Sequence, residues 1–563
     1  MAEDFMTAAV KRVEAQFEKS GVSENCAAFE RKENQIEMRD GVKLHTIYYF
    51  PKEDTAEEKT YPVILTRTCY PGNDRIHRAY GEGLARRGYV YVYQYCRGRE
   101  NSEGKWEPNI NERKDGIDTM NYLVEQPWCE ILGYWGHSYT SMTGWAFADA
   151  AEGKVAAMFL EDYGTDRFTS AYEKGCFRHD ILTAWSMENA EKPVNADYRE
   201  SCRYLPQIEV DEALWGQRVP SYREYITSPN PDAALWQTGW WKQLREIPSK
   251  TKVPIYLLSG WYDHHHGSSM KTWERLNEET KQHSWLEIGA WNHFFQICLE
   301  GKEVMHPQNE EIPKMLEWFE LTLKQKEIPT QRIRAYEIGA DRWMDTVSDG
   351  LGEKGTEGSM TLYLDEKTLR TDTPEQEKTR NYTFDPATPV ESIGGEALLH
   401  TMPQIGSHLQ PEPDYREDVL SFVSEPLEET FTLNGKASVR LFVESDCEDT
   451  AFTAKIMEVT PEGKAYNIRS SIATLEQGKT EAGTYEPGSV AEVQITMWNI
   501  VYTILKGSRI RVDVSSSDFP QYHVHSNQKG LWSEKTENKI AHQTIHTGGV
   551  HASCVILPLM KKQ

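Results

Sequence analysis

A serine in a glycine-bearing turn is the first residue of the chain whose setting indicates chemistry. Residues 133–145 read GYWGHSYTSMTGW, and the segment Gly136-His137-Ser138-Tyr139-Thr140 matches G-x-S-x-G except at its final position. In that motif a strand turns sharply into a helix and exposes the serine oxygen at the edge of a sheet. Ser138 is therefore a candidate nucleophile, and the plain alternative is that it only caps a helix.

A serine nucleophile needs a base to accept its proton and a carboxylate to orient that base. Asp263 follows the apolar run VPIYLLSGWY, and His293 follows the run SWLEIGAWN. The order serine, acid, histidine, each after a strand, is the order found in doubly wound hydrolases. We therefore predict that Ser138, Asp263 and His293 meet at one rim of a parallel sheet as a catalytic triad.

Three adjacent histidines, His264, His265 and His266, directly follow Asp263. Such a run suggests a metal, yet successive side chains point in different directions, and no cysteine or carboxylate is spaced to complete a tetrahedral zinc site. We therefore expect no metal and no cofactor, and we expect these histidines to line the pocket or steady the triad.

The elements that must position these residues alternate between strand and helix. This alternation predicts an α/β fold with a mainly parallel sheet covered by helices on both faces. A hairpin is expected at 35–50, and a helix that precedes the serine is expected at 115–128. Further strands are expected at 62–70, 88–98, 131–135, 155–160, 253–263, 284–291 and 333–339, with a helix at 314–325.

The alternation is interrupted once and then stops. Residues 163–247 are polar and aromatic and predict a mainly helical insertion. From about residue 341 short alternating runs recur between turn residues, which is typical of an antiparallel jelly roll. We predict an α/β-hydrolase domain at 1–162 and 248–340, a helical cap at 163–247 and a β jelly-roll domain at 341–563.

Composition limits the partners. The 563 residues have a formal net charge of −25, which argues against a nucleic-acid partner because phosphate binding needs clustered Lys and Arg. Nine scattered cysteines without a C-x-x-C pair argue against a disulfide framework. The first residues predict an amphipathic helix rather than a signal peptide, and no apolar run is long enough to span a membrane. We expect a cytoplasmic protein with no membrane partner, and a homodimer remains open.

Several of these segments together resemble one family. MRDGVKL (38–44), TRTCY (66–70), RGRENSEGKWEP (97–108), the helix before the serine, and RIRVDVSSSDFPQY (509–522) are similar to conserved stretches of the CocE/NonD hydrolases. That group contains cocaine esterase, the α-amino-acid ester hydrolases and the X-Pro dipeptidyl-peptidases. The resemblance extends from about residue 35 to the C-terminus.

The resemblance implies a serine esterase or acyl hydrolase that cleaves a small-molecule ester or amide through an acyl-enzyme on Ser138. It implies His293 as the general base and Asp263 as its partner. It also implies an oxyanion hole formed by the Tyr70 hydroxyl and the backbone N–H of Tyr139. Donors aimed at the developing oxyanion are worth about 3–4 kcal/mol each.

The chain departs from the family pattern at three points: Cys69 replaces a proline, Tyr95 replaces an aspartate before Arg97, and Thr140 replaces the second glycine of the turn. The family's cap residues vary, so none is transferred. Three tryptophans of the insertion could line the pocket or pack in the core: Trp185, Trp215 and Trp240.

Three alternatives remain open. An X-Pro dipeptidyl aminopeptidase would need a carboxylate cluster for the substrate ammonium, for which Glu161 and Asp162 are candidates. An acyltransferase would use another nucleophile in place of water. A binding protein with a decayed hydrolase domain is the non-enzymatic alternative, and the presence of all three triad residues argues against it.

Overall fold

The computed structural model describes residues 2–52, 59–346, 351, 355–397 and 401–560. Within these residues, the N-terminal part of the chain contains a ten-stranded sheet. Its strand order is β1-β2-β4-β3-β5-β6-β9-β10-β11-β12. The strands from β4 to β11 in this order run parallel, while β1, β2 and β12 add antiparallel edges. The predicted α/β fold class is therefore confirmed.

Near-continuous apolar runs explain the parallel strands, because such strands are buried on both faces. They are β3 (Tyr61–Thr68), β4 (Val90–Tyr95), β5 (Cys129–His137), β6 (Val155–Glu161), β9 (Ile255–Tyr262), β10 (Trp285–Asn292) and β11 (Arg332–Glu337). Every residue of β4, β9 and β10 is buried. The edge hairpin β1 (Ala28–Glu37) and β2 (Lys43–Lys52) is connected through the Asp40-Gly41 turn, and β12 (Arg342–Thr346) closes the other edge.

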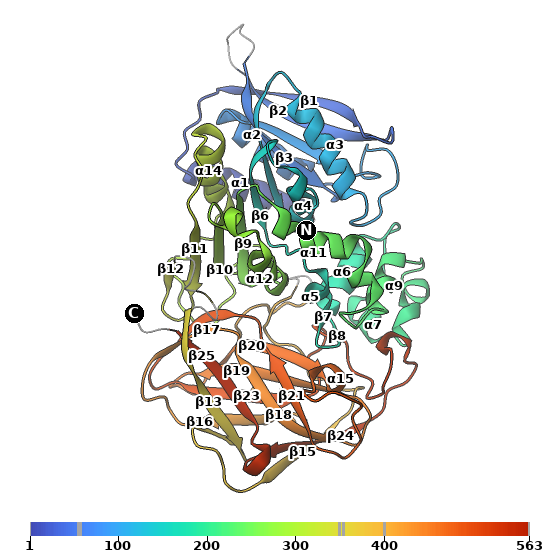
Figure 1. Cartoon of the computed structure of the whole chain (residues 1–563), viewed down its shortest axis with the longest axis vertical. Coiled ribbons are helices and arrows are strands. Elements are labelled where there is room, and N and C mark those ends of the chain that lie inside the picture. The colour runs from blue at the N-terminus through green and yellow to red at the C-terminus, as the bar shows by residue number, and fades with distance from the viewer. Residues whose placement is uncertain (1, 53–58, 347–350, 352–354, 398–400, 561–563) are drawn as a thin grey trace.

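Helices cover both faces of this sheet (Figure 1). One face packs against α1 (Ala2–Lys19), α2 (Asp74–Arg86) and α14 (Glu311–Phe319), which continues as a π-helical segment at Glu320–Lys324. The other face packs against α3 (Glu112–Val124), α4 (Tyr139–Trp145), α11 (Gly239–Lys250) and α12 (His266–Arg275). The sequence predicted α1, α3 and α14 but not α2.

The segment between β6 and β9 is mainly helical. It contains α5 (Arg167–Ala171), α6 (His179–Glu188), α7 (Tyr198–Arg203), α8 (Val210–Ala213), α9 (Pro220–Ile226), α10 (Ala234–Gln237) and α11, with a short hairpin of β7 (Tyr172–Glu173) and β8 (Cys176–Phe177). Figure 1 shows these helices beside the carboxyl ends of the sheet and above the C-terminal strands.

The C-terminal part is a β structure whose described strands pair antiparallel, except that β14 pairs parallel with β16. Its strands run from β13 (Thr356–Asp365) to β25 (Cys554–Met560). Alternating burial in β18 (Ser438–Ser445) and β21 (Ala491–Thr496) follows the alternation in their sequences. Because β12 pairs with β11, the first sheet extends past residue 340, where we predicted the boundary.

Candidate active site

The turn at Ser138 joins β5 directly to α4 and is strained. Ser138 has φ +57° and ψ −125°, a conformation that L-residues rarely adopt. Its backbone N–H donates to the carbonyl of Glu161 on the neighbouring strand at 3.0 Å. A Cβ atom at Gly136 would lie 2.2 Å from the carbonyl oxygen of Thr140, so only glycine fits there. The strand and helix thus hold the serine oxygen at the sheet rim.

Thr140 fits the turn because its hydroxyl forms hydrogen bonds with the backbone N–H and carbonyl of His137. The Thr140 Oγ1 accepts a hydrogen bond from the His137 N–H and donates to the His137 carbonyl, both at 2.6 Å. The residue is buried. The departure from glycine at this position therefore adds a brace across the turn and leaves the turn intact.

The structure brings Ser138, His293 and Asp263 into one hydrogen-bonded chain. The Ser138 Oγ lies 2.9 Å from Nε2 of His293, and Nδ1 of His293 lies 2.5 Å from Oδ2 of Asp263. Asp263 and His293 are 0% and 3% exposed. With Nδ1 donating to the carboxylate, Nε2 is left as the acceptor for the serine proton.

Backbone contacts fix both partners of the serine. The N–H of His265 donates to Oδ1 of Asp263 at 2.7 Å, so both carboxylate oxygens are used. Nε2 of His137 donates to the His293 carbonyl at 2.9 Å, which anchors the loop after β10. This contact of His137 was not predicted. The only feature of the sequence that could have indicated it is the position of His137 next to Ser138 in the turn.

Tyr70 and Tyr139 lie beside the serine. Burial raises the pKa of Tyr70, with Trp185 and Ser138 acting in the opposite direction, so the phenol keeps its proton. Tyr139 is the first residue of α4, where backbone N–H groups have no intrahelical acceptor. The Tyr139 side chain points elsewhere: its hydroxyl donates to Glu112 at 2.9 Å and accepts from the Asn109 N–H at 2.8 Å.

An aromatic wall adjoins these two tyrosines. The Trp185 ring stacks on Tyr139 with centroids 5.8 Å apart, and Trp106 lies 5.9 Å from Trp185. The Trp185 Nε1 donates to the Tyr70 hydroxyl at 3.4 Å. Trp215, in contrast, packs inside the cap against Tyr222. Trp106 was not predicted for this wall, because it lies on an irregular loop without a periodic pattern.

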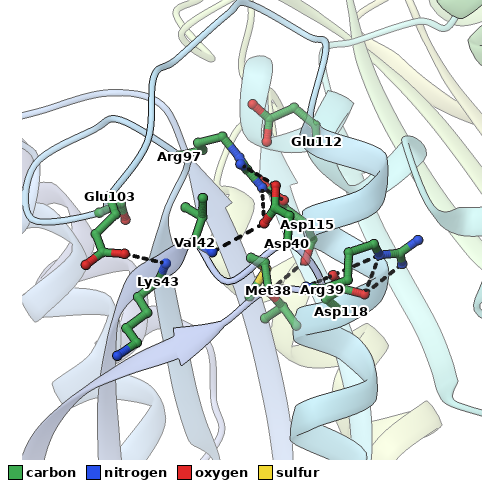
Figure 2. Close-up of polar contacts among 12 residues, drawn as sticks. Met38, Arg39, Asp40, Val42, Lys43, Arg97, Glu103, Glu112, Asp115 and Asp118 are labelled. Atoms are coloured by element: carbon green, nitrogen blue, oxygen red, sulfur yellow. Dashed lines mark hydrogen bonds and ion pairs between the residues drawn. The ribbon is translucent and has the colours of Figure 1, made fainter.

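The loop that bears Trp106 is braced by charged pairs at its base (Figure 2). Arg97 donates to Asp115 at 2.7 Å and to Asp40 at 2.8 Å. These two carboxylates replace the family aspartate, at whose position this chain has Tyr95. A Cβ atom at Gly98 would lie 2.3 Å from the Trp106 nitrogen, so the chain folds back closely there. The missing family aspartate therefore does not leave Arg97 unpaired.

The three adjacent histidines do not converge on one point. Nδ1 of His265 lies 2.9 Å from Ser170 Oγ, and Nε2 of His266 lies 3.1 Å from Asn499 Oδ1. The His264 ring lies 4.2 Å from the ring of His293. Burial lowers the pKa values of His265 and His266 well below their ordinary range. Each ring therefore has a different neighbour, and they do not form a common ligand set.

Two sets of metal-binding residue types do occur at the rim, and both include His293. One adds His137 and Asp162, and the other adds Asp263 and His264. A metal on His293 would compete for the ring nitrogens that contact Ser138 and Asp263. These residues therefore fit a hydrogen-bonded triad better than a resident ion.

Glu161 and Asp162 are adjacent acids whose side chains contact different partners. Glu161 accepts a hydrogen bond from the Trp135 indole at 3.3 Å. Burial and the neighbouring Asp162 raise the pKa of Glu161, while Trp135, Arg12 of α1 and Lys314 of α14 act in the opposite direction. Glu161 therefore faces the side of the sheet opposite the cap. Asp162 lies against His137, with 3.6 Å between Oδ2 and Nε2.

A strained serine turn, an acid and a histidine at the carboxyl edge of a parallel sheet define the class of α/β serine hydrolases. The comparisons with known proteins agree. Residues 40–295 match the family described as X-Pro dipeptidyl-peptidase (S15 family), and residues 328–556 match the X-Pro dipeptidyl-peptidase C-terminal non-catalytic domain. The chain is 27% identical to the cocaine esterase of Rhodococcus sp. (strain MB1 Bresler), over 94% of this chain and 98% of that protein.

Two solved structures have the same fold. An aminopeptidase from the marine sediment archaeon Thaumarchaeota archaeon and an α-amino acid ester hydrolase each superpose with a TM-score of 0.80 at 21% identity. They cover 95% of this chain and 96% and 97% of their own chains. The protein belongs to the CocE/NonD group of serine hydrolases and is an enzyme that cleaves ester or amide bonds. Among the described helices, none is both long and apolar enough to cross a bilayer.

Proposed function

We propose that the protein hydrolyses neutral esters that have an aromatic or bulky apolar group, through an acyl-enzyme on Ser138. The observation that supports this most strongly is the continuous chain from Ser138 Oγ through His293 to Asp263, with contacts of 2.9 and 2.5 Å. A serine held in this way is a reactive nucleophile because its proton has an oriented acceptor.

In the proposed reaction, Ser138 Oγ attacks the carbonyl carbon while its proton passes to Nε2 of His293. The carbonyl electrons move to the oxygen, which accepts hydrogen bonds from the Tyr70 hydroxyl and the Tyr139 N–H. As the tetrahedral intermediate collapses, the leaving alkoxide takes the proton from Nε2. Water then gives a proton to Nε2 and attacks the acyl carbon, and Ser138 recovers its proton as the acid leaves.

Asp263 stays ionised in this scheme and stabilises the imidazolium that forms twice in each turnover. The helix N-terminus at Tyr139 also favours negative charge near the serine. No step of this hydrolysis requires a metal or an organic cofactor.

The aromatic wall of Tyr139, Trp185 and Trp106 supports an apolar, aromatic-accepting substrate pocket. An ammonium group on the substrate would need a carboxylate partner. Glu161 faces away from the cap, and the positions after Asp263 are histidines, of which His265 is kept neutral by burial. The names of two relatives, cocaine esterase and α-amino acid ester hydrolase, also describe ester cleavage.

An X-Pro dipeptidyl-peptidase is the second candidate, favoured by the description of the matched family. A substrate panel separates the two: p-nitrophenyl benzoate, p-nitrophenyl acetate, an aminoacyl p-nitrophenyl ester and Gly-Pro-p-nitroanilide, each also measured with Ser138→Ala. We expect the highest kcat/KM for the benzoate, with activity lost in Ser138→Ala. Preference for Gly-Pro-p-nitroanilide by tenfold or more would contradict the esterase proposal.

The finer sequence-based expectations also remain proposals. They are a cytoplasmic location, the absence of a nucleic-acid partner, self-association as a homodimer, and domain boundaries near residues 162, 247 and 340. Cell fractionation, analytical ultracentrifugation and limited proteolysis test them in turn.

A further inference from the structure

One buried acid beside the triad has no part in the reaction described above. Asp162 directly follows β6, and β6 lies between β5 and β9 in the sheet. Because parallel strands end at one rim, Asp162 reaches that rim between Ser138 and Asp263. Its N–H donates to the Leu258 carbonyl at 2.9 Å, and its φ of +47° turns the chain away from the strand direction. The backbone therefore fixes this side chain next to the triad.

The surroundings of Asp162 are unusual for a carboxyl group. The residue is 0% exposed, and neither of its oxygens has a hydrogen-bond partner. Its Oδ2 lies 3.6 Å from Nε2 of His137. One oxygen of Asp162, one ring nitrogen of His137 and one ring nitrogen of His293 all lie within 4.8 Å of one another. The polar groups around Asp162 therefore include the catalytic ring of His293, the ring of His137 and the Gly260 backbone, which lowers the pKa of Asp162.

The ionisation of Asp162 depends on its burial and on the charge of Asp263. An isolated buried carboxylate is costly, so a neutral acid is favoured. Burial, with the nearby Asp263 charge as a smaller cause, raises the pKa of Asp162 well above its ordinary range, while His293 acts in the opposite direction. When two acids share one site, removing one makes it easier for the other to ionise. Loss of the Asp263 charge therefore favours a charged Asp162 beside the His293 imidazolium.

We propose that Asp162 is a second positioning acid for His293, which lies beside the imidazolium and takes over the role of Asp263 when Asp263 is removed. The separation of at most 4.8 Å exceeds a charge-assisted hydrogen bond of about 2.8 Å by at most about 2 Å. This proposal rests on the proposed roles of Ser138 and His293.

A double-mutant cycle on the full chain tests it: wild type, Asp162→Asn, Asp263→Asn and the double variant, with kcat and KM for p-nitrophenyl benzoate. A triad with one acid loses about 10⁴-fold in kcat on the Asp→Asn change. We expect Asp263→Asn to lower kcat by only about 10²–10³-fold. Asp162→Asn alone should lower kcat less than threefold. In the Asp263→Asn background, Asp162→Asn should lower kcat by a further tenfold or more. These losses should fall on kcat, with KM within about twofold.

Glu161→Gln is the matched control, because it changes the adjacent buried acid that contacts Trp135 instead of the histidines. Glu161→Gln should lower kcat by the same small factor in the wild-type and the Asp263→Asn backgrounds. If Asp162→Asn does not fold, judged by circular dichroism, Asp162→Gly replaces it, since glycine accepts the positive φ.

The proposal would be overturned if Asp162→Asn lowered kcat by the same factor with and without Asp263. A residue with a purely structural role would lower kcat equally in both backgrounds. The proposed function fails in a different way: Ser138→Ala would then be as active as the wild type. Coupling that is present in kcat, with Ser138→Ala inactive, supports both.

Discussion

Replacing Tyr70 by phenylalanine tests the proposed oxyanion hole with the smallest change the chain offers. Tyr70 lies close enough to Ser138 for the serine to lower the pKa of the phenol, and its ring centroid lies 6.2 Å from that of Tyr139. Tyr70→Phe keeps the ring and removes only the donor. Loss of one oxyanion donor costs about 10²–10³-fold in kcat, or about 2.7–4 kcal/mol. Because the carbonyl bears little charge before attack, KM should stay within about threefold.

Tyr139→Phe is the matched control for this prediction. Its hydroxyl contacts Glu112 and Asn109, whereas its proposed catalytic group is the backbone N–H, which the substitution keeps. We expect it to lower stability by about 1 kcal/mol for the lost buried hydrogen bonds, with kcat reduced less than about fivefold. Steady-state kinetics on p-nitrophenyl benzoate and thermal melts give both values. A Tyr70→Phe enzyme within threefold of wild-type kcat, or equal losses in the two variants, would refute the reasoning.

Two further predictions concern the turn and the pH dependence of stability. Gly136→Ala places a methyl group 2.2 Å from the Thr140 carbonyl oxygen, so it should lower Tm by several degrees and kcat by more than tenfold; an unchanged melt and kcat would disprove the steric argument. Burial raises the pKa of Glu311 from 4.5 to about 7, so the folded state binds its proton more tightly and stability falls as pH rises through this range. Glu311→Gln should therefore gain up to about 3 kcal/mol relative to wild type at pH 8 and nothing at pH 4 in chemical denaturation, and parallel pH profiles of the two proteins would contradict this.

The sequence was most informative where an apolar strand ends in a polar residue. The runs before Ser138, Asp263 and His293 predicted parallel strands, and parallel strands bring their carboxyl ends to one rim. The structure brings these three side chains into contact, although their roles in catalysis stay a prediction until variants are measured. The role of the Tyr70 hydroxyl in the oxyanion hole was expected only from the family resemblance, since no periodicity places a residue on a loop.

Other features depend on contacts between distant segments, which a pattern in one segment does not reveal. The helix α2 buries His77, Tyr80, Gly81, Leu84 and Ala85, and its two glycines, Gly81 and Gly83, lower the helix propensity of the segment. They are placed against the rings of Tyr49 and Phe17, which come from distant segments. Glu161 and Asp162 are neighbours that face different partners, because successive residues at a strand end point to opposite sides.

The Arg97 pairs could not be read from the sequence either. Asp40 and Asp115, which replace the family aspartate, lie 57 and 18 residues from Arg97 along the chain. Only the packed loop brings these groups together.

The most direct test of the whole account is to locate the residue that a fluorophosphonate modifies. After reaction of the wild-type protein, proteolysis and mass spectrometry should find the phosphonyl adduct on Ser138 alone, and His293→Ala should react at least about 10²-fold more slowly. An unlabelled protein, or an adduct on a different serine, would contradict the central claim that the rim of the sheet makes Ser138 nucleophilic.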